Sequence, residues 1–187
     1  MQEFASGTRL LLHSCCGPCS SRCLELLKER FAVTVLYYNP NITDEKEYEK
    51  RKLEQVRFLR ETGWADFLDC DYAPSEFFAV AKGYESEPEG GARCTRCFEL
   101  RLGYTAKAAA QNGFPVFCST LSVSPHKNAP LLNEIGQRVG AEYGVEWLCN
   151  DFKKQNGYLR SVQLAKEYSL YRQNYCGCAF SRRHDAE

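Results

Sequence analysis

The residues best suited to chemistry in this sequence are cysteines that lie close together near the N-terminus. Cys15, Cys16, Cys19 and Cys23 fall within nine positions, directly after an apolar run at 10–12. We expect Cys15 and Cys16 to lie between a short buried strand and the following helix, where an open α/β sheet forms its active-site crevice. A helix N-terminus lowers the pKa of a nearby thiol and favours the thiolate, the form that binds metals and attacks disulfides. Cysteines that only pack in the core are the simpler alternative, but free thiols rarely cluster this tightly for that purpose.

A second pair of cysteines, Cys94 and Cys97, has the C-x-x-C spacing near the predicted start of a helix. This spacing lets two sulfurs converge on one metal ion or form one disulfide. Because Cys15 and Cys16 can supply a second half-site from another loop, we predict that the four thiols form one site. Such a site suits tetrahedral zinc or an iron–sulfur cluster, and spacing does not distinguish the two. Cys19 lies near this site and is a candidate ligand for a second metal.

Cys176 and Cys178 form a third motif, C-x-C, near the C-terminus. A disulfide between them would close a very small ring, which stores strain and is easily reduced. Gly177 supplies the backbone freedom that such a turn needs. The motif therefore favours a redox-active pair, with two further metal ligands or two inert thiols as the alternatives.

Two histidines give weaker signals. His126 lies in a predicted loop after a strand, where it could donate a proton or bind an anion. A hydrogen-bonded histidine without a chemical role is an equally good interpretation, both for His126 and for His13.

Tyrosines and basic residues gather towards the C-terminus. Four residues recur at three- and four-residue steps on the predicted last helix, namely Leu164, Tyr168, Tyr171 and Tyr175. The basic residues around them are Lys153, Lys154, Arg160, Lys166 and Arg172. Core packing is the usual explanation for such a stripe. Tyrosines combined with basic groups also stack on bases and hold phosphates in RNA, so an RNA-binding surface is the alternative.

The remaining pattern indicates the scaffold that positions these residues. Apolar and β-branched runs predict strands at 10–12, 31–38, 65–70, 114–120 and 145–149. Helical spacing predicts a helix after the first cysteines, one capped by Thr43, one starting at Pro74, and others over about 97–110, 129–139 and 158–171. Because strands and helices alternate, we predict one open parallel sheet with helices on both faces, a Rossmann-like α/β fold similar to the PP-loop/HUP type.

The domain organisation follows from the same pattern. No linker or internal repeat divides the sequence, so we expect residues 1–187 to form a single catalytic domain. Residues 1–8 are predicted to be disordered. Residues 150–187 are predicted to add a basic, tyrosine-rich helix and the redox C-x-C tail to the same domain.

Charge excludes a strongly basic protein. The 24 Lys and Arg residues balance 24 Asp and Glu residues, so the overall positive charge typical of many nucleic-acid binders is missing. From residue 151 onward, seven Lys or Arg face four Asp or Glu. This excess is too small to separate a polar tail from a phosphate-binding surface.

The meaning of a high cysteine count depends on the cellular compartment of the protein. No basic start or long apolar run marks a signal peptide or a membrane span, so we expect a cytoplasmic protein without a membrane partner. Structural disulfides are rare in the cytosol, and eleven cysteines there indicate metal binding or redox catalysis. The sequence also has no glycine-rich phosphate loop, which disfavours nucleotide activation.

Taken together, the motifs resemble the cobalamin-independent epoxyqueuosine reductases, the QueH family. The resemblance runs from about residue 10 to residue 180 and no single motif carries it. It rests on these segments in order: Leu12–Cys19, Tyr38–Ile42, Glu47–Arg51, Arg93–Phe98, Ser119–Leu121 with Ser124–Asn128, and Tyr168–Cys178.

The resemblance implies an iron–sulfur oxidoreductase that reduces the epoxide of epoxyqueuosine in tRNA to the alkene of queuosine, the last step of queuosine biosynthesis. It implies a [4Fe-4S] cluster held by Cys15, Cys16, Cys94 and Cys97. It also implies a redox-active disulfide between the catalytic residues Cys176 and Cys178. An additional mononuclear iron is a further candidate cofactor. The expected partners are tRNA carrying epoxyqueuosine in its anticodon loop and an electron-donor protein or small reductant.

Two other functions stay open from the residues alone. A zinc-stabilised RNA-binding module would use the four predicted ligands structurally and would be colourless, whereas an iron–sulfur protein purified without air is brown. A thiol–disulfide oxidoreductase acting on proteins through Cys176 and Cys178 would turn over a dithiol substrate without metal.

Overall fold

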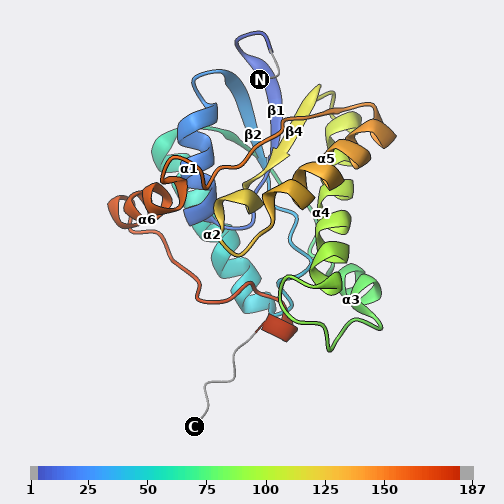
Figure 1. The fold of residues 1–187 in the computed structure, drawn as a ribbon. Coiled ribbons are helices and arrows are strands. Elements are labelled where there is room, and N and C mark those ends of the chain that lie inside the picture. The colour runs from blue at the N-terminus through green and yellow to red at the C-terminus, as the bar shows by residue number, and fades with distance from the viewer. Residues whose placement is uncertain (1–3, 182–187) are drawn as a thin grey trace.

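The computed structural model describes residues 4–181, which form a five-stranded parallel sheet flanked by helices (Figure 1). The strands are β1 (Thr8–His13), β2 (Phe31–Leu36), β3 (Asp66–Leu68), β4 (Val116–Ser119) and β5 (Glu146–Trp147). They lie in the order β3-β2-β1-β4-β5, and each neighbouring pair is parallel. The predicted open parallel α/β sheet is therefore confirmed.

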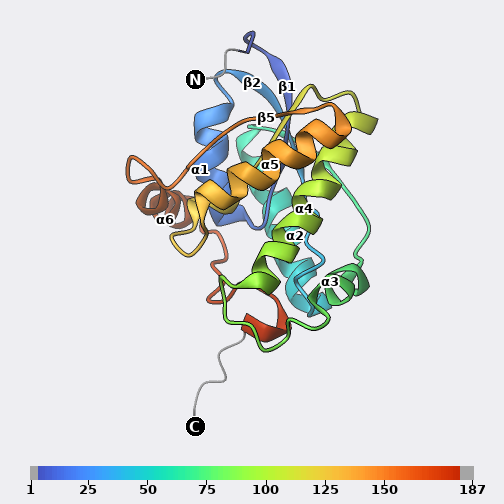
Figure 2. The ribbon, with the colours of Figure 1, turned by 45° about the vertical axis from the view of Figure 1, so that its right-hand side comes forward.

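Helices cover both faces of this sheet (Figures 1 and 2). The helices α1 (Gly17–Leu27), α2 (Glu45–Thr62) and α6 (Gly157–Glu167) lie on one face. The helices α4 (Ala92–Gln111) and α5 (Ala129–Tyr143) lie on the other, and the short α3 (Pro74–Ala81) packs against α4. Two short 3-10 helices occupy Thr120–Val123 and Ala179–Ser181. No helix within the described residues is both long and apolar enough to cross a membrane.

The core is centred on β1. Its residues Leu10, Leu11 and Leu12 are each 0% exposed. Successive residues of a strand point to opposite faces, so a continuous buried run requires helices on both sides. The three leucines thus hold β1 in the middle of the sheet and fix where the chain after it emerges.

The carboxyl ends of β1 and β4 lie side by side at the point where the order of the strands in the sheet reverses. From β1 the chain proceeds through β2 to β3, whereas β4 and β5 lie on the other side of β1. The connections that leave β1 and β4 go to opposite faces, which opens a crevice beyond the strand ends. His13, the last residue of β1, is the register partner of Ser119, the last residue of β4. The cysteines after β1 therefore lie where open α/β sheets bind their ligands.

Two helices begin at other residues than predicted. Asp44, not Thr43, caps α2, because its Oδ1 accepts hydrogen bonds from the amides of Lys46 and Glu47 at 3.1 and 3.3 Å. The helix α4 begins at Ala92, five residues earlier than predicted, after the turn at 88–91. The C-x-x-C motif therefore lies within the first two turns of this helix.

The last helix is shorter than predicted. It ends at Glu167, after which Ser169 adopts a left-handed backbone with a φ of 50° and the Leu170 amide bonds back to the Ala165 carbonyl at 2.7 Å. Residues 168–178, here called the C-terminal strap, continue as irregular chain against α2. The predicted helical stripe of Leu164, Tyr168, Tyr171 and Tyr175 is therefore wrong.

The predicted disorder of residues 1–8 is also wrong for residues 4–8. The Phe4 ring packs edge-on against Phe31, with centroids 5.7 Å apart. The Gly7 amide donates to the Arg30 carbonyl at 2.9 Å, and Thr8 begins β1. Residues 1–3, and residues 182–187 of the predicted tail, lie outside the described residues.

Candidate functional site

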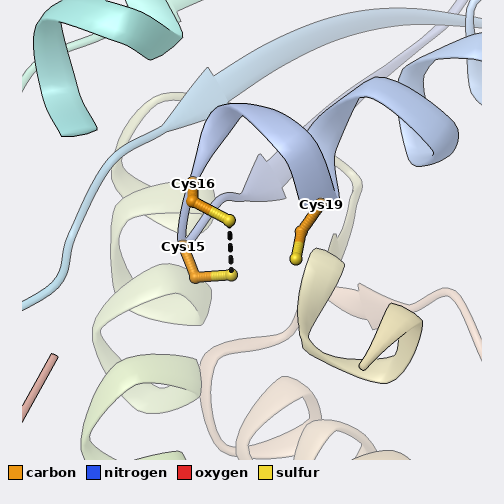
Figure 3. Close-up of side chains that lie close together, drawn as sticks. All are labelled: Cys15, Cys16 and Cys19. Carbon is orange, nitrogen blue, oxygen red and sulfur yellow. Dashed lines mark hydrogen bonds between the residues drawn. The ribbon is translucent and has the colours of Figure 1, made fainter. Parts of the chain in front are cut away.

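Three sulfur atoms gather at the junction of β1 and α1. The side chains of Cys15, Cys16 and Cys19 point toward one another (Figure 3), and their sulfurs all lie within 4.8 Å of each other. Cys16 is the N-cap of α1, and Cys19 follows one turn later, so helical spacing brings both to the same side. Pro18 stabilises this arrangement because its fixed φ suits the first turn of a helix.

The three thiols share protons unequally. Hydrogen bonds from Cys16 and Cys19, with smaller contributions from Arg101 and Thr120, hold the pKa of Cys15 well below its usual range despite burial. The same hydrogen bonds raise the pKa of Cys16 to about 12 and raise that of Cys19. One thiolate at Cys15 is thus stabilised by two neighbouring thiols. A cation that displaces their protons would gain three soft sulfur ligands from one short segment.

A second group of thiols lines a narrow cavity beside the first turn of α4. Its sulfur residues are Cys94, Cys97, Cys176 and Cys178, and Arg101 and Lys127 share the same walls. The cavity measures about 10 Å³, room for roughly one water. Burial raises the pKa of Cys97 to about 12, against the opposing effect of Arg101, and burial also raises that of Cys178.

The structure places the four predicted ligands in two groups of thiols, and Arg101 interacts with both groups. Within the described residues, Cys15 and Cys16 have Cys19 as their third sulfur, and Cys94 and Cys97 do not join that group. They line the cavity of Cys176 and Cys178 instead. The i, i+3 spacing of Cys16 and Cys19 is the sequence signal that could have identified the third sulfur.

Arg101 lies between the two groups of thiols. The residue is 1% exposed, and its guanidinium hydrogen-bonds to Cys97 and interacts electrostatically with Cys15 and Cys176. It also donates to Asn39 Oδ1 at 2.7 Å. Sequence patterns gave no reason to expect a buried arginine here, since arginine is almost never fully buried unless paired.

His13 is a neutral member of the same polar network. Its Nδ1 lies 2.8 Å from Ser119 Oγ, and its Nε2 lies 3.0 Å from the Tyr38 carbonyl and 3.3 Å from Arg101 Nε. Burial, followed by the charge of Arg101, lowers the pKa of His13 to about 3. His13 is therefore buried, hydrogen-bonded and neutral in the metal-free protein.

Lys127, rather than His126, faces the thiols. His126 is exposed, whereas the Lys127 side chain is only 8% exposed. Lys127 Nζ lies 3.8 Å from Cys176 Sγ and 3.1 Å from Glu89 Oε1. Helix α5 begins directly after this loop, capped by Asn128, whose Oδ1 accepts from the Leu131 amide at 3.1 Å. The cap fixes the loop and so directs the ammonium group towards the cavity.

Polar contacts with α2 hold the C-terminal strap and the C-x-C turn. Arg51 donates to the carbonyls of Tyr175 and Cys176 at 3.3 and 3.1 Å and pairs with Glu47 at 2.6 Å. Gly177 has a φ of +113°, and a Cβ there would lie 2.9 Å from a carbon of Ile42. Both cysteines of the turn are free thiols. The turn is thus fixed in place, and its glycine is required by conformation and by space.

The strap also reaches the first group of sulfurs. Gln173 Nε2 donates to Cys16 Sγ at 3.0 Å, and Glu54 Oε1 accepts from the Tyr171 amide at 2.6 Å. Tyr168 packs into the core against Phe58 and Trp64. These tyrosines have separate roles and do not form the predicted common face. One segment therefore carries Cys176 and Cys178 and also contacts the Cys15 group.

Comparison with known proteins identifies relatives along almost the whole chain. The family described as "Epoxyqueuosine reductase QueH" matches residues 10–184. The protein named epoxyqueuosine reductase QueH from Staphylococcus epidermidis is 43% identical over 92% of this chain and 76% of its own length. The protein of that name from Streptococcus pyogenes serotype M1 is 44% identical over 93% of this chain and 70% of its own length. The one from Thermotoga maritima is 37% identical over 92% of this chain and 89% of its own length. The chain therefore belongs to the epoxyqueuosine reductase QueH family.

Proposed function

We propose that this chain reduces the epoxide of epoxyqueuosine in tRNA to the alkene of queuosine, the last step of queuosine biosynthesis. Family membership supports the reaction, because the relatives are named for it. The observation that carries the proposal is the convergence of two thiol groups on Arg101 at the reversal point of the sheet. This arrangement suits electron and proton transfer more than a purely structural role.

The two thiols of the C-x-C turn can supply all the electrons and protons that one turnover consumes. Removal of the epoxide oxygen as water, leaving a carbon–carbon double bond, consumes two electrons and two protons. Oxidation of the Cys176 and Cys178 thiols to a disulfide releases the same two electrons and two protons. An electron-donor protein or small dithiol reductant then reduces the disulfide for the next cycle.

The sulfur donors fit an iron–sulfur group. We propose a [4Fe-4S] cluster held by Cys15, Cys16, Cys94 and Cys97, with Cys19 as a further donor for it or for an additional mononuclear iron. The mutual approach of Cys15, Cys16 and Cys19 supports the first half of this site, and soft thiolate ligands favour iron–sulfur groups and zinc over hard cations. When bound, such a group supplies one-electron transfer and a Lewis-acidic metal.

The chain's own residues then position the dithiol. Arg51 holds the carbonyls of the turn, and Gly177 allows the backbone to pass close to Ile42 and to the Arg51 side chain. Lys127 places a positive charge beside the Cys176 sulfur, and Glu89 neutralises its other side. Cys178 is 6% exposed, so the Cys176 sulfur is the more accessible of the two to a reductant.

We place the contact with tRNA on the exposed side of α6 and on the loop 124–128. Tyr158 is 44% exposed, and Arg172 Nη2 donates to its hydroxyl at 3.4 Å. Leu159, at 55% exposure, and the exposed Lys166 lie on the same helix. An exposed aromatic ring beside a cation is the combination that stacks on bases and holds the phosphate backbone.

The decisive experiment uses full-length protein purified without air and reconstituted with iron and sulfide. It is incubated with epoxyqueuosine-containing tRNA and a reductant, and the nucleosides are measured by mass spectrometry. We expect epoxyqueuosine to lose one oxygen atom and become queuosine. Brown protein that binds this tRNA but never converts it would refute the proposal, and colourless protein containing only zinc would support the RNA-binding alternative.

The ligand role of Cys19 has its own test. Replacement of a metal ligand should weaken metal affinity by at least the roughly 10–100-fold typical of supporting residues. We therefore expect Cys19→Ser to bind Co²⁺ at least about tenfold more weakly than wild type. Cys149→Ser is the matched control, because Cys149 is exposed and lies outside the three-sulfur group. Equal affinities for the two variants would remove Cys19 from the site.

A further inference from the structure

Arg101 is one of the largest fully buried side chains in the described part of the protein, at 1% exposure. It lies on α4 one turn after Cys97, so the helix that carries the C-x-x-C motif also carries this guanidinium. Its oxygen and nitrogen partners are Asn39 Oδ1 at 2.7 Å and His13 Nε2 at 3.3 Å. Neither an amide oxygen nor an imidazole nitrogen carries a negative charge that could neutralise the guanidinium.

A buried guanidinium normally needs an anion, and among residues 4–181 no carboxylate lies within ion-pair distance of Arg101. The buried arginine Arg51 on α2 has such a partner in Glu47. The thiols of Cys97 and Cys176 line the same cavity as Arg101, and the charge of Arg101 also acts on the Cys15 thiol. They come from the loop after β1, from α4 and from the strap. Arg101 is thus the point at which three separate segments present sulfur to one positive charge.

We propose that Arg101 is the counter-cation of the thiolate site, and that it lets the thiolates of the β1 loop and of α4 bind one metal group together. The inference rests on the proposed function, in which these thiols bind such a group. A divalent ion held by four thiolates carries a net charge of about −2, which is expensive to bury without a compensating cation. Arg101 provides that cation, because its guanidinium stays protonated at any pH at which the protein is folded.

This role predicts an order of variants that a hydrogen-bonding role does not. Arg101→Lys keeps the charge and loses the guanidinium geometry, whereas Arg101→Gln keeps an amide donor for Asn39 and loses the charge. If charge matters, the lysine variant binds metal more tightly than the glutamine variant. If the hydrogen bond matters, the order reverses.

The test titrates reduced, metal-free, full-length protein with Co²⁺ alone and follows the thiolate-to-cobalt absorption. We expect Arg101→Lys to bind within about threefold of wild type, and Arg101→Gln to bind about 10–100-fold more weakly, the range for residues that support metal ligands. Arg138→Gln is the control for net charge, since Arg138 on α5 is 50% exposed and loses the same unit of charge at the surface. It should bind as wild type does.

Each outcome bears on one conclusion. Glutamine at or above lysine at position 101, or a loss of affinity in Arg138→Gln equal to that in Arg101→Gln, would overturn the counter-cation role. Urea unfolding of the metal-free variants shows whether each is folded. If Arg101→Gln does not fold, Arg101→Lys alone tests the counter-cation role, which then requires Arg101→Lys to retain near-native Co²⁺ affinity. Wild-type protein without any thiolate-to-cobalt absorption would instead remove the metal centre from the proposed function, and the role of Arg101 with it.

Discussion

Replacement of Arg51 by methionine should release the C-x-C turn from α2. Arg51 Nε lies 2.6 Å from Glu47 Oε1, and the two side chains are 2% and 12% exposed. The guanidinium also donates to the carbonyls of Tyr175 and Cys176. In Arg51→Met the Glu47 carboxylate stays buried without its cation, and the two carbonyls lose their donor. The variant should therefore be destabilised, or its turn should detach, or both.

The size of the effect follows from burial. Removal of one partner of a buried ion pair costs about 3–5 kcal/mol, mostly from the charge left behind. With a urea m-value of about 2 kcal/mol/M, the unfolding midpoint would fall by roughly 1.5–2.5 M. Arg57 on the same helix is the matched control, because it also pairs with glutamates and donates to strap carbonyls but is 37% exposed. Exposed pairs of this kind contribute about 0–1 kcal/mol, so Arg57→Met should lower the midpoint little.

Urea unfolding followed by tryptophan fluorescence gives the global effect, and hydrogen exchange over residues 171–178 shows whether the turn detaches alone. The double variant Glu47→Gln/Arg51→Met should recover part of the loss, since it removes the uncompensated carboxylate. The reasoning fails if Arg51→Met is no less stable than Arg57→Met and its strap exchanges no faster.

Two further expectations concern a glycine and a histidine. Gly177→Ala should lose about 1–2 kcal/mol from its positive φ and roughly 1–3 kcal/mol more from the carbon atom that a Cβ would meet at 2.9 Å. Gly83→Ala, with a φ of +83° and nothing within 4 Å, should show the first loss only, and equal urea midpoints would contradict this difference. His13 has a pKa of about 3 in the folded, metal-free protein and 6.5 as its ordinary value, so the unfolded chain binds a proton below pH 6.5 that the folded chain does not. The free energy of unfolding should therefore fall as the pH decreases. Between neutral pH and pH 5 it should fall by about 2 kcal/mol more in wild type than in His13→Gln. Parallel curves of stability against pH for the two proteins would disprove this expectation.

The sheet was predictable because its signals are local. Three leucines at 10–12 and the β-branched run at 31–36 indicate buried strands without reference to any other part of the chain. The end of α6 was not, since the tyrosine spacing continues past Glu167 while the backbone turns at Ser169. Periodicity reports which residues could share a face, and tertiary contacts decide whether they do.

The site was predictable only in its parts. Adjacent thiols and the C-x-x-C and C-x-C spacings identify reactive cysteines from sequence alone. Which sulfurs meet depends on how α4 and the strap approach the loop after β1, and no local pattern encodes that distance. Arg101 and Lys127 were not predicted for a related reason. Arginine and lysine are usually exposed, and these two are buried because of tertiary contacts that no local pattern shows.

The narrowness of the cavity between the two cysteine pairs has a kinetic consequence. A space of about 10 Å³ admits roughly one water and no sugar or cyclopentane ring. An anticodon-loop nucleoside can therefore meet the buried Cys178 sulfur only after the surrounding chain has opened, whereas the partly exposed Cys176 is reached without entering this cavity. A step that needs Cys178 directly is then limited by the rate of that opening, and the Arg51 hydrogen bonds that hold the turn also slow access to it.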